Sequence, residues 1–273
     1  MQAAGQRKKK EEKGRKGKNR MVHFVGAGCG AADLITVRGA RLIAEADVII
    51  YAGSLVNPQL LLDARPGCRI YNSAKMTLEE VIAVMKAAEE KGQTTVRLHT
   101  GDPSLYGAIR EQIDILEEKG ISYDICPGVS SMAGAAAALG AEYTLPGISQ
   151  SVVITRAEGR TAVPERENLK SFAGHGATMV IFLSAGLAEQ VQKSLLEGGY
   201  GEDVPVAVVF KATWPEERII RTTLKNLAAD MEREQIDHTA LIIVGNILGA
   251  EYEKSRLYDA SFTTGFREAQ KCD

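Results

Sequence analysis

The feature that most constrains the fold is a regular alternation of short apolar runs and amphipathic stretches, which begins at residue 22. The first apolar run, 22–25, leads directly into the glycine-rich segment 26–30. The next stretch predicts a helix that has Thr36 as its N-cap and extends to about Ala46. Alternating strands and helices are typical of a mostly parallel sheet with helices on its faces. The sequence therefore predicts an α/β fold.

The first half of the chain carries the remaining elements of such a sheet. Thr77 and Glu80 have the spacing of a helical capping box, and Gly92 stands where the helix that starts at Thr77 should end. Further strands are expected at 48–51, 68–71, 94–98 and 123–126, and further helices at 104–119 and 129–139.

The alternation changes around Tyr143–Gln150, a segment that contains Pro146-Gly147, and a domain boundary is predicted there. The strands expected beyond it follow one another closely, which favours a mixed sheet; they lie at 152–155, 178–183, 204–210, 218–222 and 240–244, with helices at 187–197 and 224–233. The predicted organisation is a basic tail (1–20), an N-terminal α/β domain (21–145), a mixed-sheet C-terminal α/β domain (150–249) and a C-terminal tail (250–273).

Composition excludes several classes of protein. Hydrophobic residues make up 45% and charged residues 25% of the chain, which argues against wholesale disorder. No apolar run approaches the ~20 residues of a membrane span, and no secretory signal is visible, so a cytoplasmic protein without a membrane partner is predicted. Neither a disulfide framework nor a metal site is predicted from the spacing of Cys29, Cys68, Cys126, Cys272, His23, His99, His175 and His238.

Charge is divided unevenly along the chain. Residues 1–20 hold nine Lys or Arg residues against Glu11 and Glu12, so they carry +7, whereas residues 21–273 carry −9. A solvated, disordered tail is expected, with Met21 as a candidate start of the folded part. The alternative is a tail that binds RNA, but it has no aromatic residue on which a base could stack. The acidic remainder also disfavours a nucleic-acid surface.

Three glycine-bearing loops follow three of the expected strands. The segment Gly26–Ala31 fits G-x-G-x-x-G/A, but the next helix starts late and the second strand ends without an acid, which disfavours a nicotinamide-dependent oxidoreductase. The other two loops are Thr100–Pro103 and Pro127–Ser131. Carboxyl ends of parallel strands share one edge, so the three loops are expected to converge on one pocket. The alternative for Asp102 and Ser130 is a purely local capping role.

Basic residues follow two of the strands expected in the second half of the chain. Arg156 and Arg160 follow one strand, and Lys211 begins Lys211–Pro215 after another. Arginine binds carboxylates bidentately, so these three residues are candidates for holding an acidic substrate, with solvated surface charges as the alternative. No G-x-S-x-G and no Walker A motif is present.

Taken together, these segments resemble the tetrapyrrole methylases. The resemblance covers about residues 21–267, and Cys29 stands where the first loop of that family usually has proline. It is carried by Gly26–Gly30 with Asp33–Val37, Tyr51–Val56, His99–Gly107, Pro127–Ser131, Thr155–Arg160 with Val163–Glu165, Lys211–Pro215 and Arg221–Thr223.

The resemblance implies two α/β domains, a homodimer, and S-adenosyl-L-methionine bound between the domains. By position it assigns the cofactor to Gly28, Cys29, Thr100, Gly101, Asp102, Leu105, Tyr106, Ser130, Ser131, Leu183 and Ala212, with Thr239 and Ala240 as weaker candidates. A metal site in the protein is not implied.

The implied activity is methyl transfer to ring carbon C11 of a precorrin in cobalamin synthesis, with S-adenosyl-L-homocysteine as the second product. Arg156, Arg160 and Lys211 would bind the carboxylates of the tetrapyrrole. His99, Tyr106 and Glu158 are candidate bases. Members of the same fold that methylate another precorrin carbon, ribosomal RNA or a diphthamide precursor are the alternatives.

Overall fold

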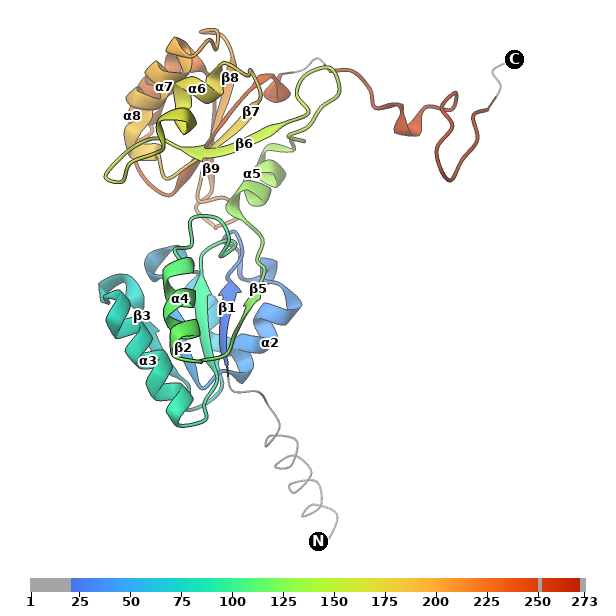
Figure 1. The fold of residues 1–273 in the computed structure, drawn as a ribbon. Coiled ribbons are helices and arrows are strands. Elements are labelled where there is room, and N and C mark those ends of the chain that lie inside the picture. Colours follow the sequence, from blue (N-terminus) through green and yellow to red (C-terminus); the bar gives the residue numbers. More distant parts are fainter. Residues whose placement is uncertain (1–20, 250–251, 271–273) are drawn as a thin grey trace. The chain divides into compact units, whose positions relative to one another are not determined.

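The computed structural model describes residues 21–249 and 252–270, which form two compact units that divide between Ser130 and Ser131 (Figure 1). The predicted basic tail lies outside the described residues. The division falls before the predicted boundary at 143–150, since helix α5 (Ser131–Leu139) contacts a strand of the second unit. Each unit contains one five-stranded sheet.

The first sheet was predicted to be mostly parallel, and all of its strand pairs are parallel. Its strands lie in the order β3-β2-β4-β1-β5, so the carboxyl ends of all five reach the same edge. The strands are β1 (Val22–Gly26), β2 (Val48–Tyr51), β3 (Arg69–Asn72), β4 (Thr95–His99) and β5 (Tyr123–Cys126), and the helices are α2 (Val37–Glu45), α3 (Leu78–Glu90) and α4 (Arg110–Glu118).

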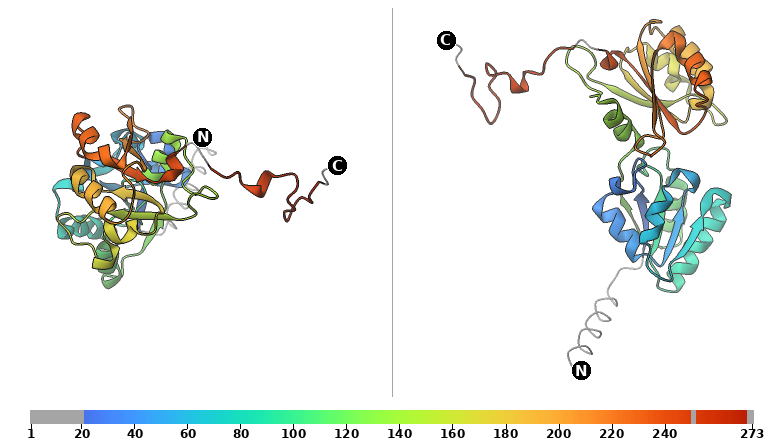
Figure 2. Two further views of the ribbon diagram at one scale, coloured as in Figure 1. Left: turned by 90° about the horizontal axis from the view of Figure 1, so that it is seen from above. Right: turned by 180° about the vertical axis from the view of Figure 1, so that it is seen from behind.

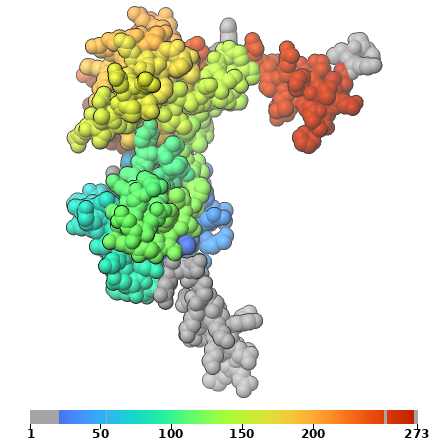
Figure 3. Space-filling model, in the orientation of Figure 1, coloured from blue at the N-terminus to red at the C-terminus, as the bar shows by residue number. Residues whose placement is uncertain are grey.

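The two faces of this sheet are covered by different helices. Ile43 of α2 is buried in one apolar cluster with Val25 and Leu98, whereas Met85 of α3 and Leu116 of α4 are buried in another. On the side shown in Figure 3, α3 and α4 form the surface of the first unit. Successive side chains of a strand point to opposite faces, so β1 and β2 each supply residues to both clusters.

Local sequence signals set most helix boundaries in the first unit. The Thr36 hydroxyl accepts a hydrogen bond from the Gly39 N–H at 3.1 Å, and the capping box of Thr77 and Glu80 is formed, so both predictions are confirmed. The predicted helix start at residue 104 is wrong, because α4 begins only at Arg110. Residues Tyr106 and Ala108 have φ values of 56° and 48°, a left-handed conformation that a right-handed helix excludes.

The second sheet is mixed, as predicted. Strand β6 (Val152–Arg156) is parallel to β7, while β10 is antiparallel to both of its neighbours. Strands lie in the order β6-β7-β10-β8-β9; the remaining ones are β7 (Thr178–Phe182), β8 (Pro205–Phe210), β9 (Arg218–Thr223) and β10 (Ala240–Val244). Figure 2 shows the ribbon from above and, in its right-hand view, from behind.

One apolar core fills the space between this sheet and the helices α6 (Leu169–Ala173), α7 (Ala188–Glu197) and α8 (Leu227–Arg233). Within the described ranges, no helix is both long and apolar enough to cross a bilayer. Short 3₁₀ helices occupy Ala32–Leu34, Gly53–Leu55, Pro58–Asp63, Ser73–Lys75, Glu165–Glu167, Ala185–Leu187, Leu224–Asn226, Asn246–Leu248 and Arg256–Tyr258.

Candidate functional site

Three glycine-bearing loops meet at the carboxyl edge of the first sheet. The Gly28 N–H donates to the Gly101 carbonyl at 3.3 Å, and the Gly101 N–H donates back to Gly28 at 3.0 Å. A Cβ placed on Gly26 would lie 2.5 Å from the Gly128 Cα and 2.6 Å from the Gly101 oxygen. The three backbones are therefore packed too closely for side chains, and the loops converge as expected from their shared edge.

Asp102 joins two of these loops. Its Oδ1 accepts from the Ser104 N–H at 2.8 Å and from the Ser104 hydroxyl, while Oδ2 accepts from the Gly128 N–H at 2.8 Å. Burial raises the pKa of Asp102, but these hydrogen bonds outweigh burial and hold the pKa below the usual 3.8. Since α4 begins at Arg110, the alternative that Asp102 is a helix cap is wrong.

The loop that follows Asp102 is tightly folded and presents an aromatic ring. A Cβ on Gly107 would lie 2.2 Å from the Pro103 oxygen, and Tyr106 is 45% exposed in its left-handed conformation. Leu105 is half-buried, and the Thr100 hydroxyl donates to the Leu55 carbonyl at 3.2 Å. Left-handed, non-glycine residues concentrate at ligand-binding sites, so this loop is the strongest candidate for contact with a ligand.

The remaining candidates of the first edge belong to the first and third glycine-bearing loops. Cys29 is buried, and Gly28 has a φ of 85°, which favours glycine. Ser130 ends the first unit, whereas Ser131 begins α5 in the second, and both are half-buried. Sequence reasoning missed the buried Asn57, whose side chain donates to the Gly30 carbonyl at 2.9 Å and thereby shapes the first loop. Its position before Pro58 at the start of a helix was the available signal.

The candidates of the second unit gather at one edge of its sheet. Because β10 is antiparallel to β7 and β8, its first residues lie beside the last residues of those strands. The Lys211 N–H accordingly donates to the Thr239 carbonyl at 2.9 Å. Leu183, Lys211 and Thr239 all have a left-handed conformation, and Leu183 is 66% exposed. Ala240 and the buried Ala212 flank this edge.

The three basic candidates of the second unit have different surroundings. The Arg156 guanidinium donates to the carbonyls of Ala157, Thr161 and Ala162 at 3.2, 3.1 and 2.7 Å. These hydrogen bonds stabilise the loop that follows Arg156. Arg160 in that loop is exposed. The Lys211 ammonium lies 5.7 Å from the centre of the Trp214 ring and 5.6 Å from that of Phe210.

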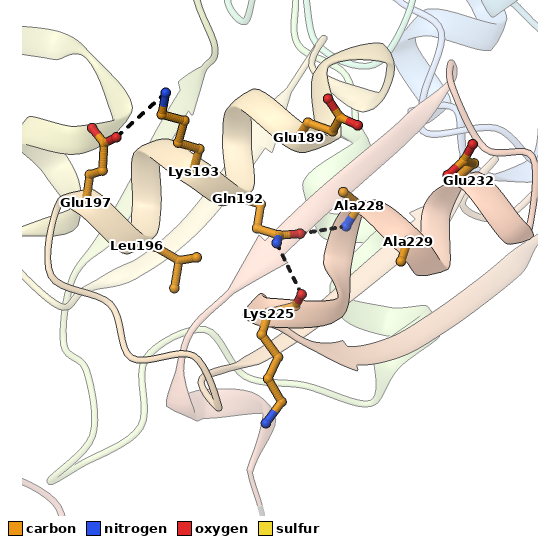
Figure 4. Close-up of a pocket in the computed structure, with 9 residues that line it drawn as sticks. All are labelled: Glu189, Gln192, Lys193, Leu196, Glu197, Lys225, Ala228, Ala229 and Glu232. Carbon is orange, nitrogen blue, oxygen red and sulfur yellow. Dashed lines mark hydrogen bonds and ion pairs between the residues drawn. The ribbon is translucent and has the colours of Figure 1, made fainter.

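A groove between α7 and α8 on the second unit is a separate feature (Figure 4). Its lining mixes charges of both signs, including Glu189, Lys193 and Glu232. The Gln192 side chain joins the two helical segments, because its amide donates to the Lys225 carbonyl at 3.1 Å and accepts from the Ala228 N–H at 2.9 Å. The groove lies between helices rather than at strand ends, and we assign it to helix packing. No group of acidic, histidine or cysteine side chains suited to a metal ion occurs in the described part of the chain.

His99 lies at the end of β4 and is almost wholly buried. Burial, assisted by the positive charge of Arg97, lowers the pKa of His99 to about 3. The ring therefore stays neutral near pH 7, and it is unsuited to take up a proton in a reaction. His99 stays a hypothesis for the base, and its burial makes it a weaker candidate than an exposed side chain.

The buried His99 predicts a pH dependence of folding. An unfolded histidine takes up a proton near pH 6.5 but the folded one only near 3, so stability present above pH 6.5 is lost as the pH falls towards 3. We expect this group to lower the free energy of unfolding by up to about 1.4 kcal/mol per pH unit in that range. Urea denaturation between pH 7 and 5 should show a shallower dependence in His99→Gln, while His175→Gln at an exposed position keeps the original slope. Equal slopes in all three proteins would contradict the assignment.

Comparisons with known proteins decide the family. A family model described as tetrapyrrole (corrin/porphyrin) methylases matches residues 21–228. The chain belongs to the tetrapyrrole methylase family. The resemblance seen in the sequence is thereby confirmed.

Individual members of this methylase family are similar over nearly their whole length. The chain is 54% identical over 254 residues to the cobalt-precorrin-4 C(11)-methyltransferase of Methanocaldococcus jannaschii, covering 93% of this chain and 98% of that protein. The solved structure of a cobalamin biosynthetic enzyme, cobalt precorrin-4 methyltransferase, matches with a TM-score of 0.83 and 46% identity over 84% of this chain and 96% of that one. Uroporphyrin-III C-methyltransferase from Thermus thermophilus, complexed with S-adenosylhomocysteine, matches with a TM-score of 0.71 and 27% identity over 86% and 96%.

Proposed function

We propose that this methylase transfers a methyl group from S-adenosyl-L-methionine to C11 of precorrin-4 or cobalt-precorrin-4 and releases S-adenosyl-L-homocysteine. The observation that carries the proposal is the 54% identity to a cobalt-precorrin-4 C(11)-methyltransferase over 98% of that protein. The nicotinamide-dependent alternative has no such support, and α2 begins at Val37, too far beyond Gly30 to serve a dinucleotide loop.

The carboxyl edge of the first sheet fits an adenosyl sulfonium. The backbones of Gly26, Gly101 and Gly128 pack without room for side chains between them, Asp102 is an ionised carboxylate, and Tyr106 is exposed. We assign the donor to the candidates of this edge: Gly28, Cys29, Thr100, Gly101, Asp102, Leu105, Tyr106 and Ser130.

The sulfonium supplies an already activated methyl group when bound. The protein therefore contributes chiefly by orienting the two reactants and excluding water, and ideal proximity can supply about 7–11 kcal/mol. The tightly folded loop at Leu105 and Tyr106 is suited to orientation because Gly107 packs against the Pro103 carbonyl with no room for a side chain between them. Among the candidate bases, Tyr106 and Glu158 are exposed and His99 is not, so a base is assigned only to the first two as alternatives.

The basic residues of the second unit are proposed to bind substrate carboxylates. Arg160 is the most direct test, since it is exposed while Arg156 is engaged with loop carbonyls. Arg160→Ala should raise the KM for the tetrapyrrole roughly fivefold through loss of a charge-assisted contact. The Kd for S-adenosylhomocysteine should stay unchanged. The exposed Arg166 offers the matched control variant, Arg166→Ala, and an equal effect of both variants on KM would refute a specific role of Arg160.

A homodimer in the cytoplasm is proposed from the family resemblance alone, and sedimentation equilibrium would test the association. The reaction itself is tested with S-adenosylmethionine labelled in its methyl group. Mass spectrometry should find the label in precorrin-4 or its cobalt complex, and carbon NMR should place it on C11. Label on another ring carbon, or in ribosomal RNA, would assign the protein to another branch of the family.

A further inference from the structure

Arg97 is a charged side chain in the interior of the first unit. It lies on β4 and is only 7% exposed, beneath the face of the sheet that α3 and α4 cover. Burial lowers the pKa of Arg97 to about 10, so the guanidinium is still charged at neutral pH. Among the described residues no carboxylate forms an ion pair with it. Burying a charge without an acidic partner costs free energy of folding. The two neutral groups that accept hydrogen bonds from Arg97 therefore indicate what this charge does.

These partners orient one amide side chain. The Arg97 Nε donates to Gln112 Oε1 at 3.0 Å, and Nη1 donates to the Ile50 carbonyl at 3.2 Å. A guanidinium can only donate hydrogen bonds. Gln112 must therefore turn its oxygen towards Arg97, which directs its NH₂ group the other way. That group donates to the Ala108 carbonyl at 2.9 Å.

The Ala108 carbonyl belongs to the tightly folded loop after Asp102. Ala108 and Tyr106 both have left-handed conformations, with φ values of 48° and 56°. Residues without glycine's freedom persist in this conformation only where the surroundings hold them. Gln112 is 4% exposed, and its hydrogen bond restrains the Ala108 carbonyl from the protein interior.

We propose that Arg97 and Gln112 are positioning residues, which hold the Ala108 carbonyl from below and so fix the loop that presents Leu105 and Tyr106 to the methyl donor. The inference rests on the proposed function, because the loop serves the reaction only if the donor binds at this edge. Neither residue is proposed to contact the reacting atoms.

Gln112→Glu keeps the hydrogen bond from Arg97 and removes the one to the Ala108 carbonyl. A carboxylate still accepts from Arg97 and now pairs with its charge, but it has no N–H for Ala108 and places an oxygen against the carbonyl. We expect the Kd for S-adenosylhomocysteine, measured by titration calorimetry, to rise roughly tenfold. The melting temperature should be unchanged or higher, and amide hydrogens of residues 104–108 in the ligand-free protein should exchange faster.

Gln93→Glu is the matched control. Gln93 Oε1 also accepts from an arginine, Arg69, at 2.6 Å, and Gln93 precedes β4, whereas the loop follows it. The control should keep the wild-type Kd and the wild-type exchange at 104–108. If Gln112→Glu does not fold, Gln112→Met removes the same donor and takes its place in both measurements.

The outcomes distinguish the two proposals. A wild-type Kd and wild-type loop exchange in Gln112→Glu would overturn the positioning role. Weaker binding accompanied by a lower melting temperature and faster exchange throughout the first unit would also overturn it, since the effect would then be general destabilisation. If the wild-type protein binds no S-adenosylhomocysteine while the variant still loosens only residues 104–108, the hold on the loop stands and the proposed function fails.

Discussion

Gly128→Ala is expected to destabilise the first unit by about 3 kcal/mol or to prevent it from folding. The new Cβ would lie 2.1 Å from the Gly101 oxygen and 2.7 Å from the Gly26 Cα. Both neighbours are backbone atoms at the ends of central strands, so neither can move without separating the loops. Urea denaturation followed by circular dichroism should show the loss of stability.

Gly159→Ala is the control for this substitution. A Cβ there would lie 3.5 Å from a side-chain carbon of Leu187, an ordinary van der Waals distance. We expect its free energy of unfolding to stay within about 0.5 kcal/mol of wild type. A Gly128→Ala protein as stable as Gly159→Ala would show that the three loops are not packed as described.

Asp102→Asn is expected to give the largest effect on the site that leaves the fold in place. The change preserves shape, but an amide has one oxygen, so its NH₂ group must face either the Gly128 N–H or the Ser104 N–H. The variant loses a charge-assisted hydrogen bond and places the new NH₂ group against a backbone N–H. Together these changes destabilise the contact between the loops by about 2 kcal/mol. If the joined loops form the donor site, the Kd for S-adenosylhomocysteine should rise roughly 30-fold.

Asp259 provides a closely matched control for Asp102. Its Oδ1 accepts from the Ser261 N–H at 2.8 Å and from the Ser261 hydroxyl at 2.7 Å, the same local turn in an exposed segment. Asp259→Asn should leave the Kd unchanged. An unchanged Kd in Asp102→Asn as well would mean that the joined loops do not form the donor site.

The ionisation of Asp102 adds a pH dependence to the same comparison. Because its folded pKa lies below 3.8, its contribution to stability is present above pH 3.8 and is lost as the pH falls through the lower, folded pKa. Asp102→Asn should lack this part of the acid denaturation of the wild-type protein.

Local chemistry explains which parts of the fold could be predicted from the sequence. Thr36 and Thr77 act through neighbours three residues away, so their helix starts are visible in a short segment. The convergence of the glycine loops follows from a general property of parallel sheets. Both kinds of inference need no knowledge of distant contacts.

The parts that could not be predicted depend on the conformations of loops, although the residues in contact lie only four to six positions apart in the chain. The loop around Tyr106 and Ala108 has helix-compatible residues, and its left-handed conformation is held by Gln112 from the interior. The sequence therefore suggested a helix that starts six residues too early. Arg156 has the position of a substrate-binding residue, but its hydrogen bonds to Thr161 and Ala162 depend on how the loop folds. Strand-end position alone does not reveal such contacts.

The central claim is that the glycine loops at the carboxyl edge of the first sheet hold the methyl donor. A crystal structure of the protein with S-adenosylhomocysteine tests it most directly. We predict electron density for the ligand against Gly28, Gly101, Asp102 and Tyr106. Ligand bound elsewhere, with this edge empty, would contradict the account.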